Sequence, residues 1–221
     1  MQETKTPLTD EEKANIQLLE TTDGILTGVT DPDKLIGSLV LPDGITEIDM
    51  LAFPYCFGLT SIIIPDSVTK IGDYAFFGCT GLTELSVDSE NPAYCSENNI
   101  LYTKDKKHLI ATAGGLKGRV VLPDGVTEIG ACAFKWCTDL TSIVIPNTVT
   151  IIGERAFHSC WNLKTVIIES TIIKHIGEDP FKRVNADIHF TVKTDAVKAM
   201  LKKNTAIRDE QITVEPNANS L

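Results

Sequence analysis

The sequence predicts an α/β solenoid, a stack of 23-residue coils that share a parallel β-sheet. LPDGITEI at residues 41–48 recurs as LPDGVTEI at 122–129, and IPDSVTKIG at 64–72 recurs as IPNTVTIIG at 145–153. Neighbouring units are 23 residues apart, as Pro42 and Pro65 show. Within four units an Ala-Phe pair, a cysteine and a leucine also follow one another at a spacing of three. Repetition with a fixed period is typical of solenoids, in which each coil is stabilised by its neighbours.

Each unit predicts a short strand, a turn and a return segment. Leucines and other apolar residues alternate in the pattern L-x-x-L-x-L, which is typical of leucine-rich-repeat strands, at residues 59–64, 82–87, 140–145 and 163–168. Proline then ends the strand, because it has no N–H to donate. The Ala-Phe segment is expected to return as a short helical or irregular stretch. Gly72, Gly130 and Gly153 are expected to adopt a backbone conformation that other residues resist.

Phenylalanine and cysteine are predicted to form ladders inside the stack. The phenylalanines should be buried and stacked at one repeat position, at Phe53, Phe76, Phe134 and Phe157. Four cysteines recur three residues later, at Cys56, Cys79, Cys137 and Cys160, and a small soft side chain suits a packed site. All six cysteines, including Cys95 and Cys132, are expected to be reduced. Disulfides between neighbouring coils, catalysis and metal binding remain the alternatives for these thiols.

The period breaks in the middle of the chain. Residues 88–122 are longer than a standard unit, and they are predicted to contain a β-hairpin of residues 100–103 and 108–111 around a polar turn. Residues 23–27 look like a shorter version of residues 98–103. A fifth, less regular unit is indicated by Phe181.

Helices are predicted to cap both ends of the solenoid. Thr9 and Glu12 form a capping-box pattern before an apolar stretch. Thr194 and Asp195 start a second helix, which places Val197, Met200 and Leu201 on one face. We therefore predict an N-terminal helical cap and lead-in at 1–34, a solenoid at 35–190 with an irregular insertion at 88–122, and a C-terminal cap helix and tail at 191–221. The tail beyond Glu215 is expected to be disordered.

Composition and motifs argue against several classes of function. The net charge of −10 disfavours nucleic acid and anionic membranes as partners. No apolar stretch is long enough to span a membrane, and the polar N-terminus does not resemble a signal peptide. The histidines are scattered, and neither a zinc-site spacing nor a phosphate-loop motif occurs. We expect no metal, no cofactor, no membrane insertion and no enzymatic activity.

The units IPDSVTKIGDYAFFGCTGLTEL and IPNTVTIIGERAFHSCWNLKTV resemble the BspA-like leucine-rich-repeat family. The resemblance covers about residues 35–190, and ADIHFTVKTDAVKAML resembles the strand and helix that end many members. It implies a binding module found chiefly on bacterial and protist surfaces, with a host or extracellular-matrix protein as the partner. The resemblance therefore implies a cell-surface or secreted location. The missing signal peptide leaves the cytoplasm as the alternative.

Two groups of side chains are candidates for binding. One is the outward row of the predicted strands, which is apolar at Ile63, Val144 and Ile167 and polar at Ser86. The other consists of aromatic residues next to the ladder cysteines, Tyr55, Phe57, Trp136 and Trp161. Exposed aromatic residues are typical of binding hot spots, but these rings would also suit packing between coils. We expect a non-catalytic protein-binding module in cell-surface adhesion or host interaction. The alternative is an intracellular protein-interaction scaffold.

Overall fold

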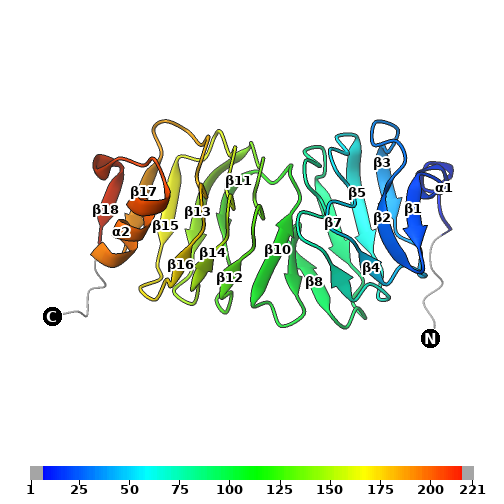
Figure 1. The fold of residues 1–221 in the computed structure, drawn as a ribbon, viewed down its shortest axis with the longest axis horizontal. Helices are drawn as coiled ribbons and strands as arrows, with labels where there is room; N and C mark the ends of the chain where they lie inside the picture. The colour runs from blue at the N-terminus through cyan, green and yellow to red at the C-terminus, as the bar shows by residue number, and fades with distance from the viewer. Residues whose placement is uncertain (1–6, 216–221) are drawn as a thin grey trace.

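The computed structural model describes residues 7–215 and shows an elongated stack of coils (Figure 1). One row of strands is made by the longer strand of each coil. It consists of a three-stranded sheet and a five-stranded sheet: β3 (Gly37–Val40), β5 (Leu59–Ile64) and β7 (Glu84–Val87); and β11 (Gly118–Val121), β13 (Leu140–Ile145), β15 (Thr165–Ile168), β17 (His189–Val192) and β18 (Ile212–Val214).

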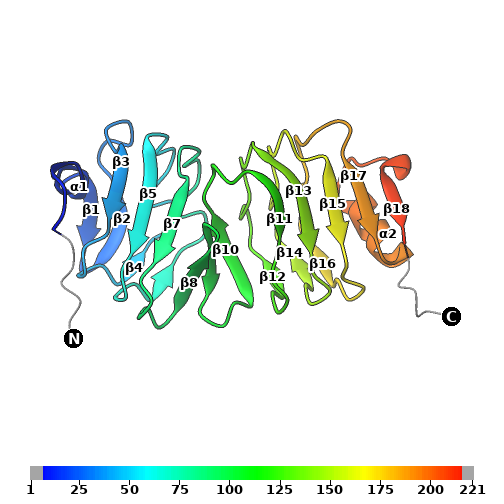
Figure 2. The ribbon, with the colours of Figure 1, turned by 180° about the vertical axis from the view of Figure 1, so that it is seen from behind.

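Among the described residues, a second row has ten strands, of which five are only two residues long. Figures 1 and 2 show the stack from two opposite sides. This row also consists of two sheets: β1 (Leu19–Thr22), β2 (Ile25–Val29), β4 (Glu47–Ile48) and β6 (Lys70–Ile71); and β8 (Tyr94–Glu97), β9 (Ile100–Thr103), β10 (His108–Thr112), β12 (Glu128–Ile129), β14 (Ile151–Ile152) and β16 (His175–Ile176). Both rows are therefore interrupted, between β7 and β11 and between β6 and β8. We call this interruption the seam.

Strand register confirms the solenoid with its parallel sheets. Ile62 on β5 pairs in parallel with Leu85 on β7, and Ile143 on β13 pairs with Val166 on β15, 23 residues further along in each case. The apolar residues of the L-x-x-L-x-L pattern point inward and are buried, except for Val87, which is half-buried.

The phenylalanine ladder is present, and its rings are buried. Phe53 stacks on Phe76 with ring centroids 5.6 Å apart, and Phe134 stacks on Phe157 at 4.9 Å. Phe157 also stacks on Phe181 of the fifth unit at 5.0 Å. The return segments around these rings are turns rather than helices. The ladder has two sections, because the structure forms one hydrophobic cluster on each side of the seam.

The six cysteines are all free thiols, and the four ladder cysteines are buried. Cys79 and Cys160 donate to the carbonyl oxygens of Phe53 and Phe134 in the preceding coil, at 3.2 and 3.0 Å. Burial raises the pKa of Cys137 to about 12 and raises that of Cys160. A buried thiol that stays protonated is a packing group rather than a nucleophile.

The expectation for the repeat glycines is wrong, because Gly72, Gly130 and Gly153 do not have a positive φ. These glycines recur at one position of the repeat for a steric reason. An ideal Cβ on Gly153 would lie 2.5 Å from the backbone nitrogen of Ala131 in the preceding coil, and one on Gly72 would lie 2.5 Å from that of Met50. Neighbouring coils approach so closely at this position that a side chain has no room.

The inserted hairpin is confirmed, with β9 and β10 antiparallel. The structure adds a third strand, β8, which pairs with β9 and was not expected. Ile100, Leu101 and Tyr102 are consecutive in β9 and are all buried. Ile100 and Tyr102 belong to the C-terminal hydrophobic cluster, whereas Leu101 belongs to the N-terminal one. Strand β9 therefore lies between the two clusters and contributes side chains to both.

A helix covers the N-terminal end of the stack. Helix α1 (Asp10–Ile16) begins with the expected capping box between Thr9 and Glu12. Buried Asn15 donates from Nδ2 to the carbonyl oxygens of Ile36 and Ser38, both at 2.7 Å, and so pairs with groups at the edge of β3.

The second helix, α2 (Asp195–Asn204), starts at Thr194 as expected and packs against β16, β17 and β18. Val197 and Leu201 are buried and Met200 is half-buried. A 3-10 helix (Asp209–Gln211) then leads into β18, which extends the long-strand row. The expected disordered tail, residues 216–221, lies outside the described residues.

Candidate functional site

The aromatic candidates lie on the return segments, at positions set by an unusual backbone. In each return, the residues two before and two after the core phenylalanine have a left-handed conformation. Tyr55 follows Phe53 in this way with a φ of 57°, and Trp136 follows Phe134 with a φ of 65°. The coil between them has Gly78 at the same position, with a φ of 84°. A left-handed residue turns the chain sharply, and here the turn presents the ring at the surface.

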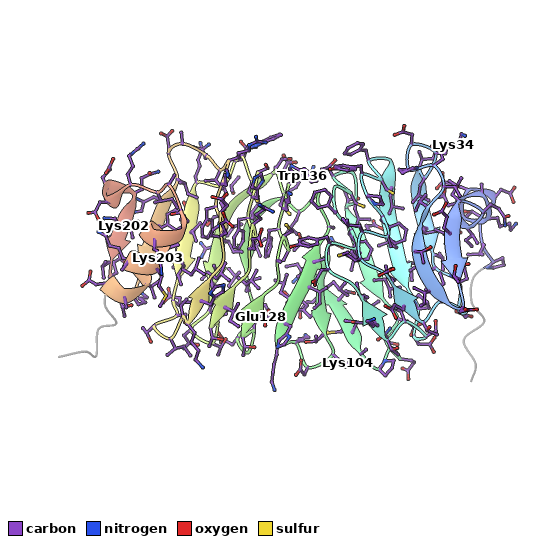
Figure 3. All side chains as sticks on the ribbon, in the orientation of Figure 1. Lys34, Lys104, Glu128, Trp136, Lys202 and Lys203 are labelled. Carbon is purple, nitrogen blue, oxygen red and sulfur yellow. The ribbon has the colours of Figure 1, made fainter. Side chains whose placement is uncertain are left out.

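Four rings meet at this edge and form what we call the aromatic cluster: Tyr55, Phe57, Phe77 and Trp136. Tyr55 contacts Phe57, Phe77 and Trp136, with ring centroids 5.9, 5.3 and 6.0 Å apart. Phe77 and Trp136 are 4.9 Å apart. Tyr55 and Phe57 remain 49% and 55% exposed, so the cluster is a packed unit with an open apolar surface. Figure 3 shows Trp136 near the middle of the array.

Gly78 explains how rings from non-adjacent repeat units meet. An ideal Cβ on Gly78 would lie 2.8 Å from Cδ1 of Tyr55 and 3.2 Å from Cζ3 of Trp136. The absent side chain leaves room for the two rings to approach over this glycine.

A lysine adds a positive charge to the aromatic cluster. The Lys135 ammonium lies 4.2 Å from the ring centroid of Phe77 and 4.8 Å from that of Trp136, which is cation–π geometry. Burial lowers the pKa of Lys135. The ring faces hold the ammonium at the edge of the cluster, where it would favour acidic groups on a partner.

The strand candidates form rows in the expected register. Val121, Val144 and Ile167 are direct neighbours on β11, β13 and β15, and we call them the apolar ridge. Val121 is 60% exposed, whereas Val144 and Ile167 are half-buried. Ile63 is 39% exposed and lies beyond the seam, between Val40 on β3 and Ser86 on β7.

The structure brings together only some of the sequence-predicted residues. Tyr55, Phe57 and Trp136 share the aromatic cluster, but Trp161 lies outside it and is 55% exposed. Phe57 precedes β5 and Ile63 lies near its end, so the two are separated by most of the strand, about 13 Å at 3.3 Å per residue. The aromatic cluster and the strand rows are therefore separate surfaces.

Sequence reasoning missed three residues of these surfaces, Phe77, Lys135 and Val121. Phe77 and Lys135 occupy the same repeat position, directly after the core phenylalanine. A residue next to a buried one at a turn points away from the core, so this position was a readable signal. Val121 precedes Leu122-Pro123 just as Val144 precedes Ile145-Pro146, and the repeat alignment would have revealed it.

The described residues offer no grouping suited to a bound metal, since no three His, Cys, Asp or Glu side chains come together among them. In residues 7–215, neither helix has the length and apolar character that a bilayer crossing requires.

Comparisons with known proteins agree on the repeat architecture. The profile of the "BspA type Leucine rich repeat region" matches residues 33–107 and 117–215 in six copies. A search of curated proteins finds no significant match.

Solved structures of bacterial leucine-rich-repeat proteins have the same fold. A leucine rich cell surface protein from Faecalibacterium prausnitzii aligns with a TM-score of 0.59 and 23% identity, over 84% of this chain and 56% of the other. The pneumococcal vaccine antigen PcpA aligns with a TM-score of 0.56 and 16% identity, over 82% of this chain and 68% of the other. The chain thus spans just over half the length of the Faecalibacterium protein.

Proposed function

The chain belongs to the BspA-type leucine-rich-repeat family, and from that premise we propose that it is a non-catalytic protein-binding module of a cell surface. In this proposal it acts in adhesion or host interaction, with a host or extracellular-matrix protein as partner. The names of two similar structures, a cell surface protein and a vaccine antigen, support a surface location.

The aromatic cluster is the observation on which the binding proposal mainly rests. Large rings that are half exposed and already packed against one another lose little side-chain entropy when a partner covers them. A cation beside them adds a charge that selects acidic partner groups. The apolar ridge of Val121, Val144 and Ile167 is a second candidate contact, because a solvated sheet face would normally have polar residues there.

The chemistry of the described residues supports a non-catalytic role. The buried thiols of Cys137 and Cys160 are held in the protonated form, which is the poor nucleophile. The Cys160 thiol donates to the carbonyl oxygen of Phe134, and both thiols are buried in the core, where a substrate has no access.

Adherence of protein-coated beads to cultured epithelial cells and to immobilised extracellular-matrix proteins tests the proposal. Phe57→Ala should weaken adherence or the corresponding affinity about 30-fold, which corresponds to the ~2 kcal/mol of a hot spot. Trp161→Ala is the matched control, because Trp161 occupies the same repeat position outside the aromatic cluster. Equal adherence of wild type and Phe57→Ala would exclude the cluster.

The apolar ridge is tested separately. Ile167→Asp places a charge in the ridge, and Ile63→Asp places one at the equivalent position across the seam. Loss of adherence in Ile167→Asp alone would assign binding to the ridge. Retained adherence in both variants would remove the strand rows from consideration.

A further inference from the structure

A slot opens in the middle of the array, at the seam. Its volume is about 390 Å³, and it is lined by the return at residues 72–80, by residues 130–133 and 135 of the return across the seam, and by residues of β10 and the segment that follows it. It adjoins the aromatic cluster, because Phe77 and Lys135 line it.

The slot exists because the return at residues 110–117 is short and has several small side chains. Leu109 pairs with Ile129 and Gly118 pairs with Leu140, so residues 110–117 take the place that residues 130–139 have in the next coil. Eight residues thus replace ten. The segment contains Ala111, Ala113, Gly114 and Gly115, and an ideal Cβ on Gly114 would lie 2.8 Å from the carbonyl oxygen of buried Cys79. The short return therefore packs low against the core and leaves the outer level of this coil empty.

Elsewhere in the stack, returns bind one another through their backbones. Alternate N–H groups of one return donate to alternate carbonyl groups of the next. Before the seam the pairs are Leu51 to Asp73 at 3.3 Å, Phe53 to Ala75 at 2.8 Å and Tyr55 to Phe77 at 2.8 Å; after it they are Cys132 to Glu154 at 2.9 Å, Phe134 to Ala156 at 2.7 Å and Trp136 to His158 at 3.0 Å.

This pattern stops at the slot. Within residues 7–215, the N–H groups of Tyr74, Phe76 and Gly78 have no such partner. The carbonyl groups that would face them belong to Ala131, Ala133 and Lys135, and only that of Ala133 accepts a hydrogen bond, from the Thr112 hydroxyl at 2.8 Å. Both sets of residues line the slot. Backbone donors and acceptors are strong groups that need partners, so the slot is a pre-formed hydrogen-bonding template.

We propose that the slot binds a peptide segment of a partner protein, which inserts between the two returns and adopts their turn conformation. Its carbonyl groups accept from Tyr74, Phe76 and Gly78, and its N–H groups donate to Ala131 and Lys135 on the other side. Five residues in the conformation of residues 74–78, where Phe77 donates to the carbonyl oxygen of Tyr74 at 2.9 Å, are enough to meet three alternate donors. Main-chain bonds of this kind supply affinity in strand-addition complexes.

We assign the segment to a partner protein. Both described ends of the chain lie at the far ends of the stack, away from the seam (Figure 1). The proposal rests on the proposed protein-binding function and names the form of the partner, a peptide segment held through its backbone.

A displayed library of random seven-residue peptides, selected on the wild-type protein, is the probe. Ala131→Tyr fills the slot, and the fold accepts larger residues at this repeat position, since neighbouring coils have Asp73 and Glu154 there. Glu154→Tyr is the matched control one coil away from the slot. Selected peptides should bind the wild type and Glu154→Tyr equally and should bind Ala131→Tyr at least tenfold more weakly. Failure to enrich any peptide, or equal binding to all three proteins, would overturn the proposal.

Amide hydrogen exchange on the wild-type protein gives a readout that does not depend on a variant folding. A bound peptide should slow exchange at Tyr74, Phe76 and Gly78 at least tenfold. The amides of Phe53 and Tyr55, which are already bonded to the next coil, are the internal controls and should not change. Unchanged exchange at all three slot amides in the presence of saturating peptide would refute backbone pairing.

Methylated peptides test the hydrogen bonds themselves. Methylation of the peptide nitrogens that face Ala131 and Lys135 should abolish binding, whereas methylation of the alternate nitrogens should be tolerated. Equal tolerance of both patterns would overturn backbone pairing in the slot.

The two proposals fail separately. Adherence that is lost in Phe57→Ala but kept in Ala131→Tyr supports the aromatic cluster and excludes the slot. Peptides that bind in the slot of a protein with no measurable adherence would support the slot and refute the proposed adhesion.

Discussion

A glycine-to-alanine series tests whether the spacing between coils, rather than backbone conformation, fixes the repeat glycines. In Gly153→Ala the new methyl group would lie 2.5 Å from the Ala131 nitrogen and 2.6 Å from the Gly130 carbonyl carbon. Ordinary contact begins at 3.4 Å, so the two coils must separate by about 0.9 Å. That movement also stretches the 2.8 Å hydrogen bond from Gly153 to Ile129.

The expected magnitude follows from two opposing terms. Overpacking costs about 1–3 kcal/mol, whereas a glycine-to-alanine change at an unstrained, open site stabilises by about 0.4–1 kcal/mol through the unfolded state. Gly44 is such a site, with nothing within 4 Å of an ideal Cβ. Gly125 is also open, but its φ of 101° makes alanine strained, at a cost of about 1–3 kcal/mol. Gly44→Ala should therefore be neutral or stabilising, and the other two variants should be destabilised for different reasons.

Urea unfolding followed by far-UV circular dichroism measures these differences, and thermal melting should show about 2–4 °C per kcal/mol for a chain of this size. Crystal structures of the variants would separate the two causes, because only Gly153→Ala should move neighbouring coils apart. A Gly153→Ala protein as stable as Gly44→Ala would refute the steric explanation.

Three further predictions follow from packing, capping and charge. Phe157→Ala should lower the free energy of unfolding by about 3–5 kcal/mol. This loss should exceed that of Phe76→Ala by the ~0.5–1.5 kcal/mol of one aromatic pair, since Phe157 stacks on two rings and Phe76 on one. Urea midpoints measure the difference, and equal losses would contradict it. Asn15→Ala should destabilise the protein by about 1–3 kcal/mol, because two carbonyl groups at the edge of β3 lose their partner. Amide hydrogen exchange in α1 should accelerate in this variant, and an unchanged exchange pattern would show that α1 is held by other contacts. Burial, followed by the nearby positive charge of Lys135, lowers the pKa of His158, so the folded state disfavours its protonation and stability should fall as pH drops below the ordinary value of 6.5. His158→Gln should remove this part of the pH dependence, which lies below the ordinary pKa of 6.5, and an NMR titration midpoint of His158 at or above 6.5 would contradict the reasoning.

Repeat positions were predictable from the sequence because each has one packing requirement that recurs. Phe53 and Phe134 each stack on the phenylalanine 23 residues further on, and the thiols of Cys79 and Cys160 each donate to a phenylalanine carbonyl oxygen in the preceding coil. The capping box at Thr9 and the hairpin around residues 104–107 were also predictable, since both depend on residues close in sequence.

The contacts across the seam were not predictable in this way. A repeat alignment shows which residues are equivalent, but it does not show which coils are adjacent once an insertion intervenes. Ile63 and Val144 are equivalent, yet β7 and β11 belong to different sheets and do not pair. Tyr55 and Trp136 meet because Gly78 leaves space between them, which depends on the three-dimensional stacking of three coils.

The aromatic cluster could be predicted in part. Tyr55, Phe57 and Trp136 stood out by residue type, but their partners Phe77 and Lys135 did not. The slot could not be anticipated at all, because it results from the path of residues 110–117 relative to two other returns.

Strand β9 has a consequence for how the chain folds. In a linear array, each coil is stabilised mainly by its nearest neighbours, so the weakest boundary limits the size of a cooperative unit. Within residues 7–215, the alternating backbone bonds between returns stop at the seam, where Gly115 donates to the carbonyl oxygen of Leu82 at 2.8 Å. Leu101 and Tyr102 of β9 connect the two hydrophobic clusters there. We therefore expect β9 to determine whether the two halves of the array fold together or one after the other, and a peptide held in the slot would couple them more tightly.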